Sequence, residues 1–244
     1  MYNLIVDIGN TAIKYALFSG DEIVSELRQR SLDGEELCEW LKAGRVLGAI
    51  VSSTRGDATD VEQLLRGLGI DVLMFTSDTA VPIQNDYHTP KTLGRDRLAA
   101  AVGASALYPN RDVLIVDFGT AITIDLVSAG RYCGGFISPG RDMRFKALNH
   151  FTASLPLVGA DVKDSSTGLS TEESISLGVT KGICYEIEGH ISQFREEFAN
   201  LMVIFTGGEA KDFVKRIKNT IFADCDLVIK GLNRILEYNA HVKK

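Results

Sequence analysis

The sequence predicts an α/β protein built from two domains of the same topology, and three observations support this. The segment LIVDIGNTAIKYAL, from Leu4 to Leu17, has a near copy in LIVDFGTAITIDL, from Leu114 to Leu126. After each copy, short β-branched runs alternate with longer segments that carry apolar residues at helical spacing, which is typical of α/β domains. A chain of 244 residues, 45% of them apolar, can also fill two cores of ordinary size.

The first half of the chain reads as an antiparallel meander followed by βα units. Apolar, β-branched runs predict strands at 4–8 and 12–18, with Gly9 and Asn10 in the turn between them. Further strands are expected at 21–29, 46–53 and 71–76, and helices at 33–43, at 58–68 and from about Arg97. We therefore expect a first domain at 1–110.

The second half repeats this order and predicts a second domain at 111–244. Strands are expected at 112–119, 121–128, 130–138 and 201–208, with a short one at 226–229 and a helix at 210–218. The longest helix follows Ser170, which forms a capping box with Glu173. Its apolar stripe comprises Ile175, Val179, Ile183, Ile187, Ile191, Phe194 and Phe198. Two interpretations stay open: the stripe packs on its own sheet, or part of it, beside Gly178 and Gly182, seals a dimer.

Composition excludes several classes of function. The chain carries 26 basic and 32 acidic residues, a net charge of −6, so no basic footprint for nucleic acid is available. The four cysteines form no CxxC pair and the four histidines show no paired ligand spacing, which argues against a zinc site. The N-terminus lacks a basic leader, and no apolar run approaches the length of a membrane span. We expect a cytoplasmic protein that binds a small polar ligand.

The duplicated hairpin suggests the chemistry. In each copy an aspartate, Asp7 or Asp117, ends an apolar strand and is followed by a glycine turn with amide or hydroxyl groups that can surround phosphate oxygens. A carboxylate repels phosphate, so its presence implies a cation such as Mg²⁺ between the two. The glycine patterns of P-loop and Rossmann proteins are absent from the sequence. The hairpins therefore predict a nucleotide with a metal ion.

Two further turns extend this site. The stretch FTGGEA, at 205–210, places paired glycines between a strand and a helix, where the backbone can approach a base or a ribose phosphate. In GRDR, at 94–97, a glycine turn presents Asp96 between two arginines at the start of a helix. A carboxylate there can accept the proton of an alcohol, and a guanidinium can hold a carboxylate of the acceptor.

Two such hairpins followed by a TGG turn resemble the superfamily of acetate kinase, sugar kinases, Hsp70 and actin, whose two ribonuclease H-like domains clasp ATP in the cleft between them. The complete set closely resembles type III pantothenate kinases: DIGNTAIK (7–14), GRDR (94–97), DFGTAIT (117–123), GGFISPG (134–140), STEESISLG (170–178) and TGGEA (206–210). The resemblance implies ATP-dependent phosphorylation of pantothenate to 4′-phosphopantothenate, the first step of coenzyme A synthesis. It also implies a cytoplasmic homodimer that uses Mg²⁺ and a monovalent cation, K⁺ or NH₄⁺.

The resemblance also assigns residues. It implies that ATP is bound by Asp7, Ile8, Gly9, Asn10, Thr11, Ala12, Ile13, Lys14 and Thr120. It implies that Asp117 binds the monovalent cation and that Asp96 accepts the proton. Pantothenate is expected on Tyr87, Gly94, Arg95, Asp96, Arg97 and Thr171, in a pocket at the dimer contact. The family commonly has a small residue where this chain has Arg95, which leaves the shape of that turn open.

Two alternatives remain at this stage. Another small-molecule kinase of the superfamily would keep both hairpins but need different acceptor contacts. A non-catalytic nucleotide-binding regulator is the second, since the same fold occurs in such proteins. The presence of Asp7, Asp96 and Asp117 together, and the absence of an appended helix-turn-helix pattern, speak against the regulator.

Overall fold

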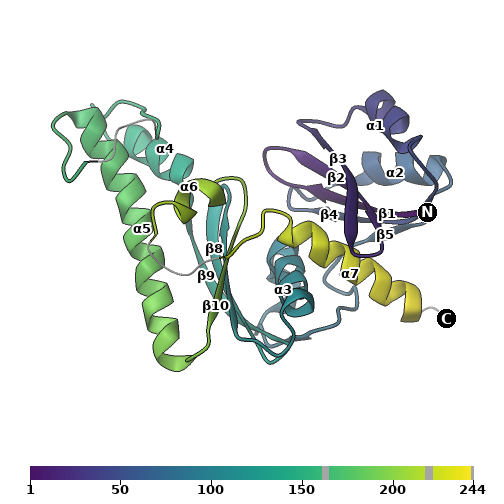
Figure 1. Cartoon of the computed structure of the whole chain (residues 1–244). Helices are drawn as coiled ribbons and strands as arrows, with labels where there is room; N and C mark the ends of the chain where they lie inside the picture. The colour runs from purple at the N-terminus through teal and green to yellow at the C-terminus, as the bar shows by residue number, and fades with distance from the viewer. Residues whose placement is uncertain (161–164, 218–221, 243–244) are drawn as a thin grey trace. The chain divides into compact units, whose positions relative to one another are not determined.

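The computed structural model describes residues 1–160, 165–217 and 222–242, and the chain forms two compact units (Figure 1). The strands are β1 (Tyr2–Ile8), β2 (Ile13–Ser19), β3 (Glu22–Gln29), β4 (Val46–Ser53), β5 (Val72–Met74), β6 (Gln84–Asn85), β7 (Val113–Phe118), β8 (Ala121–Ser128), β9 (Arg131–Pro139), β10 (Met202–Thr206) and β11 (Phe222–Ala223). The helices are α1 (Gly34–Leu41), α2 (Thr59–Gly67), the short 3₁₀ helix η1 (Pro90–Thr92), α3 (Arg95–Leu107), α4 (Arg141–Phe151), α5 (Thr171–Glu197), α6 (Ala210–Val214) and α7 (Leu227–Val242).

Unit 1 contains the first hairpin. It consists of Met1–Asn110, Val127–Gly134 and Asp226–Lys244, so residue 110 ends its first stretch but two later stretches also belong to it. Its sheet has the order β3-β2-β1-β4-β5, with β1 antiparallel to β2 and parallel to β4. The expected meander followed by βα units is confirmed. The division into domains at 1–110 and 111–244 stays a prediction.

The two faces of this sheet are covered by different helices. Successive residues of a strand point to opposite faces, and accordingly Leu4 and Val6 pack in one core with residues of α1 and α2. Ile5 lies in the other core, with residues of α3 and α7. Figure 1 shows α1 and α2 on one side of the sheet and α7 on the other. The strand carrying Asp7 is therefore packed on both faces.

The prediction of a strand at 226–229 is wrong, because Leu227, Val228 and Ile229 begin helix α7. Val228 and Ile229 favour a strand locally, but apolar residues recur at helical spacing after them and fill the core under α3. The two helices approach closely: a Cβ on Gly231 would lie 1.8 Å from the carbonyl oxygen of Ala99. Packing of the whole segment therefore overrides the local β propensity.

Unit 2 contains the second hairpin. It consists of Arg111–Leu126 and Gly135–Cys225, and its strands belong to a sheet of order β11-β10-β7-β8-β9-β6. β8 and β9 continue beyond this unit, and β6 pairs with Arg131 and Tyr132 of β9 inside unit 1. The strands expected at 112–119, 121–128, 130–138 and 201–208 are all present. Helix α6 is shorter than the one expected at 210–218, whose last residue lies outside the described residues.

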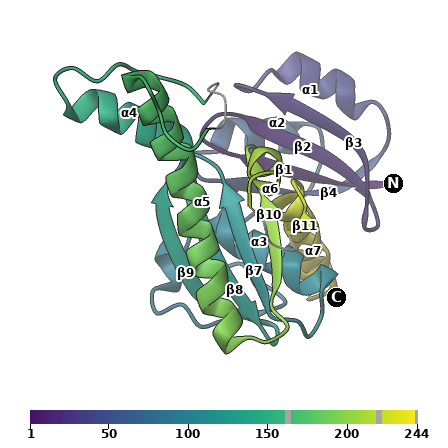
Figure 2. The same ribbon diagram turned by 60° about the vertical axis from the view of Figure 1, so that its left-hand side comes forward.

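Helix α5 lies lengthwise along the sheet of unit 2 (Figure 2). The stripe from Ile175 to Ile191 packs in the same core as Leu114, Val116 and Phe118 of β7, which confirms the first of the two interpretations of that stripe. The expected cap is also present, since Ser170 Oγ accepts a hydrogen bond from the Glu173 backbone N–H. Within the described part of the chain, no helix is long and apolar enough to cross a membrane.

Candidate active site

The first hairpin places Asp7 beside Lys14. Asp7 lies near the end of β1 and pairs across the antiparallel ladder with Lys14 of β2. The turn between them is closed by a hydrogen bond of 3.0 Å from the Gly9 backbone N–H to the Ala12 carbonyl. Asn10 and Thr11 are exposed at its tip, whereas the side chains of Ile8, Ala12 and Ile13 are buried and anchor it. The exposed amides and hydroxyl can donate to phosphate oxygens.

Asp7 is an unusual carboxylate. Its Oδ1 is buried and has no hydrogen-bond partner in the described structure. Burial raises the pKa of Asp7 to about 6, while Lys14 lowers this pKa and Asp96 raises it further. An unpaired buried carboxylate is costly for the folded protein, so its presence favours a role with a ligand. On the neighbouring strand, the buried Ser52 hydroxyl opposite Asp7 also lacks a partner.

The GRDR turn brings Asp96 close enough to affect Asp7. Gly94 is the N-cap of α3, and Asp96 lies in the first turn, where the helix dipole favours an anion. Asp96 Oδ1 accepts a hydrogen bond of 2.8 Å from the Arg97 backbone N–H. A Cβ at Gly94 would lie 2.6 Å from Asp96 Oδ1, so glycine leaves the room that this carboxylate needs. Arg95, the residue that departs from the family pattern, is half-buried.

Arg97 is held between two tyrosines. Its side chain is buried, and its guanidinium carbon lies 5.8 Å from the ring centre of Tyr87 and 6.0 Å from that of Tyr132. Such cation–π contacts are strong when the cation is desolvated. The structure thus places Tyr87 beside Arg97 of the GRDR turn. Tyr132, which sequence reasoning missed, completes the arrangement, and Tyr87 lines a cavity of about 360 Å³ with Gly134.

In unit 2, three glycine turns meet around the second hairpin. Asp117 of β7 pairs with Thr206 of β10, and the Thr206 hydroxyl is buried without a partner among the described residues. Gly207 has φ +89°, and a Cβ there would lie 2.3 Å from Asp117 Oδ1. A Cβ on Gly140 would similarly lie 2.5 Å from the carbonyl oxygen of Thr120. Only glycines allow these turns to pack so closely, which leaves the Gly119–Thr120 turn exposed for a ligand.

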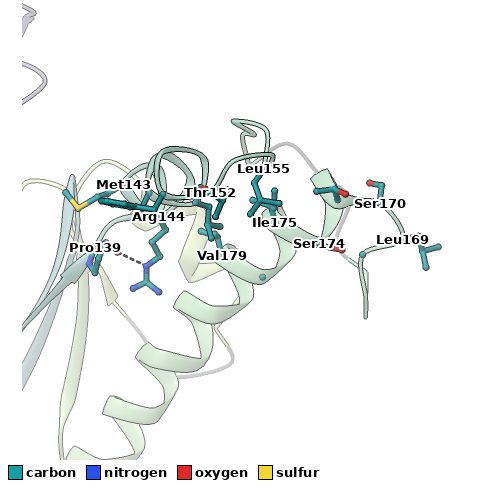
Figure 3. A pocket seen from close by; sticks show the side chains of 16 residues that line it. Pro139, Met143, Arg144, Thr152, Leu155, Leu169, Ser170, Ser174, Ile175 and Val179 are labelled. Carbon is teal, nitrogen blue, oxygen red and sulfur yellow. Dashed lines mark hydrogen bonds between the residues drawn. The ribbon is translucent and has the colours of Figure 1, made fainter.

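Thr171 lies elsewhere in unit 2. It is the first residue of α5 and lines an apolar pocket of about 1300 Å³ between α4 and α5 (Figure 3). Arg144 points into this region and donates to the Pro139 carbonyl at 2.7 Å. The sequence-predicted residues therefore fall into three groups. Unit 1 brings together Asp7–Lys14, Asp96, Tyr87 and Arg97, unit 2 joins Asp117 to Thr120 and the TGG turn, and Thr171 belongs to the apolar pocket.

A divalent cation fits the first of these groups. Within the described ranges, no three His, Cys, Asp or Glu side chains cluster as a ready-made metal cage. Mg²⁺ does not need one, because it is commonly held by one or two carboxylates together with phosphates of the substrate. The buried Oδ1 of Asp7, which lacks a hydrogen-bond donor, is a suitable ligand of that kind.

Comparison with solved structures shows which fold the chain adopts. A conserved Campylobacter jejuni protein, described as a Baf family transcriptional activator, superposes with a TM-score of 0.63 at 23% identity, covering 98% of this chain and 99% of that one. The activator of 2-hydroxyisocaproyl-CoA dehydratase from Clostridium difficile, with bound ADPNP, gives a TM-score of 0.55 at 15% identity, covering 100% and 97%. The fold is that of the actin-like ATPases and sugar kinases.

Sequence comparison then identifies the family. The family model of type III pantothenate kinase matches residues 3–193. The type III pantothenate kinase of Bacteroides fragilis strain YCH46 is 45% identical over 241 residues, covering 97% of this chain and 98% of that protein. That of Porphyromonas gingivalis strain W83 is 43% identical, covering 98% and 99%. The chain belongs to the type III pantothenate kinase family.

Proposed function

We propose that this chain transfers the γ-phosphoryl group of ATP to the hydroxyl of pantothenate, giving 4′-phosphopantothenate in the first step of coenzyme A synthesis. Family membership over nearly the whole chain supports this function. The observation that carries it is the coupling of two carboxylates in unit 1. Asp96 lies near enough to Asp7 to raise its pKa, and Lys14 pairs with Asp7 across the hairpin. A proton acceptor and a phosphate-binding hairpin thus share one site.

Asp96 is the proposed base. It accepts the proton of the pantothenate hydroxyl as that oxygen attacks the γ-phosphorus, and the bond to the bridging oxygen of ADP breaks. It lies in the first turn of α3, which fixes its position in the GRDR turn. Tyr87 and the GRDR turn bind the acceptor, with Arg97 fixed by its two aromatic neighbours. Phosphoryl transfer needs positioning and charge neutralisation rather than a covalent nucleophile.

Each hairpin is proposed to bind phosphate. In unit 1 the donors are the N–H groups of Asn10 and Thr11 and the Lys14 ammonium, and in unit 2 the donor is Thr120. Asp7 is the proposed protein ligand for Mg²⁺, which neutralises phosphate charge when bound. Asp117 is the proposed ligand for K⁺ or NH₄⁺, and the unpaired Thr206 hydroxyl beside it in the sheet is a second oxygen suited to that ion.

The assembly is proposed to be a homodimer in the cytoplasm. Its contact is assigned to α5, whose outward face carries the exposed Gly178, Tyr185 and Gly189. Small residues let another helix approach closely. The apolar pocket beside Thr171 adjoins this helix, and its exposed Phe151 and Leu169 provide apolar surface that a second copy can bury.

The experiment measures ADP release with pantothenate and with hexoses in wild type, Asp96→Asn and Asp60→Asn. Asp60 is a matched control, since it is an exposed aspartate in the first turn of another helix of unit 1. We expect pantothenate to be the accepted substrate. Asp96→Asn should lose about 10²–10⁴-fold in turnover while still binding ATP, because only the proton acceptor is removed. Asp60→Asn should retain turnover.

Three results would contradict the assignment in different ways. Turnover with a hexose but not with pantothenate would indicate another kinase of the superfamily. Binding of ATP without turnover on any acceptor would indicate a nucleotide-binding regulator. Near-normal turnover of pantothenate by Asp96→Asn would leave the function standing but remove Asp96 as the base.

A further inference from the structure

Arg141 joins the three glycine turns of unit 2. It is the first residue of α4 and directly follows Gly140, whose N–H donates to the Thr120 carbonyl at 3.1 Å. Its Nη2 lies 2.5 Å from Glu209 Oε1, in the segment that follows the Gly207–Gly208 turn. The Glu209 N–H in turn donates to the Phe118 carbonyl at 3.3 Å, next to Asp117. One guanidinium therefore links the start of α4 to the turn expected to meet the nucleotide.

The environment of Arg141 suggests more than a stabilising ion pair. Its side chain is only 13% exposed, and Asp212 approaches its Nη1 at 3.5 Å. The guanidinium carbon lies 5.8 Å from the ring centre of Phe213, which stacks on Phe118 with ring centres 4.6 Å apart. Its Nε is buried without an acceptor in the described structure. A buried donor without an acceptor lowers stability, so such donors are typical of sites selected for function.

Charge adds a second reason. Asp142, Glu209 and Asp212 form one acidic group, because Asp142 and Asp212 both act electrostatically on Glu209. Arg141 is the guanidinium that pairs with Glu209 and with Asp212. Without it, Glu209 and Asp212 would lose the guanidinium that faces them beside a glycine turn proposed to approach a polyanion, and like charges repel.

We propose that Arg141 is a positioning residue of the nucleotide site: it fixes the Gly207–Gly208 turn through Glu209 and cancels the acidic charge beside that turn, so that ATP can bind. The inference rests on the proposed function in that ATP is the ligand. It does not depend on which acceptor is used. Arg141 was absent from the site predicted from the sequence, and Glu209 lay in the predicted TGGEA turn without a role of its own, because an arginine at a helix start and a glutamate after a glycine turn are each common on protein surfaces.

The test compares Arg141→Met with Arg66→Met. Arg66 is the matched control, because it forms a similar pair with Glu62, at 2.9 Å, on helix α2 of unit 1. Steady-state kinetics are measured for ATP and for pantothenate separately, with thermal unfolding as a check of folding. We expect Arg141→Met to raise KM for ATP about tenfold, the loss typical of one charge-assisted hydrogen bond, with KM for pantothenate unchanged. Arg66→Met should change neither KM.

A second variant separates charge and positioning from general damage. Adding Glu209→Gln to Arg141→Met removes part of the uncompensated charge, so KM for ATP should fall back towards that of the wild type. A purely structural role predicts the opposite, since a second loss would add to the first. If Arg141→Met does not fold, Arg141→Lys replaces it. Lysine keeps the positive charge but lacks the planar guanidinium that can pair with two carboxylates, so this variant should raise KM for ATP about threefold.

Two results would overturn the inference: an unchanged KM for ATP in a folded Arg141 variant, or an equal rise of both KM values. Failure of the proposed function is distinguishable. If the wild type does not phosphorylate pantothenate, calorimetric titration with the non-hydrolysable analogue ADPNP still applies. The affinity of ADPNP should fall about tenfold in Arg141→Met, and equal affinities would refute the role of Arg141.

Discussion

Replacing Asp7 by asparagine should stabilise the protein while abolishing its activity. Burial raises the pKa of the Asp7 carboxyl from 3.8 to about 6 in the folded protein. A difference of about two pKa units between folded and unfolded states corresponds to about 3 kcal/mol. Asparagine has a similar shape and no charge, so it avoids this cost. The same substitution removes the proposed ligand for Mg²⁺, and functional sites commonly trade stability for activity in this way.

The sign of the pH dependence follows from the raised pKa. Below the ordinary pKa of 3.8 the carboxyl is neutral in both states, and the wild type and Asp7→Asn should be equally stable. As the pH rises from 3.8 to about 6, the unfolded chain releases this proton while the folded protein keeps it, so the wild type loses stability until both states are ionised. Above about pH 6, Asp7→Asn should therefore be more stable than the wild type by about 3 kcal/mol.

The assay is thermal unfolding from pH 4 to pH 8 in the presence of a chelator. For a chain of this size, 3 kcal/mol corresponds to a difference of about 6–12 °C in Tm at the upper end of the range. Asp21→Asn is the control, because Asp21 is exposed at the turn between β2 and β3 and should show no such growing difference. Added Mg²⁺ should stabilise the wild type but not the variant. A variant less stable than the wild type at pH 8 would refute the reasoning.

Three further predictions concern unit 2. Gly207→Ala should lower the free energy of unfolding by about 1–3 kcal/mol and weaken ATP binding, because a residue at φ +89° is strained and its Cβ would meet Asp117. Denaturant unfolding and ADPNP titration check this, and an unchanged unfolding midpoint would contradict it. Replacing K⁺ by Na⁺ or Li⁺ should lower turnover in the wild type but not in Asp117→Asn, and equal wild-type rates in all three salts would remove Asp117 from its cation role. Tyr185→Glu, on the exposed face of α5, should convert a dimer to a monomer in sedimentation, whereas an unchanged mass would place the contact elsewhere.

The parts of the fold that the sequence predicted are those where local pattern and packing agree. The strands around Asp7 and Asp117 alternate or run apolar, and a glycine follows each, so both hairpins were predictable. The cap at Ser170 was predictable because its side chain and Glu173 satisfy the helix start by themselves. The start of α7 was not, because Val228 and Ile229 favour a strand until the surface of α3 selects a helix.

The site shows the same division. Motifs that fold as one turn, such as Asp7–Lys14 and Gly94–Arg97, could be predicted because their chemistry lies in neighbouring residues. Tyr132 and Arg141 could not be predicted, because the role of each depends on contact with a residue distant in the chain. Tyr132 faces Arg97, and Arg141 meets Glu209. No spacing rule in a single sequence connects such residues.

The close packing of α3 against α7 has a consequence for folding during translation. The helix that carries Asp96 rests on a segment translated more than a hundred residues later, and Asn233 of α7 also bonds to Asn3 of β1 at 3.0 Å. A nascent chain on the ribosome therefore holds an apolar surface on α3 and β1 uncovered until α7 emerges. Such late closure favours capture by chaperones and makes the assembly of this unit slow.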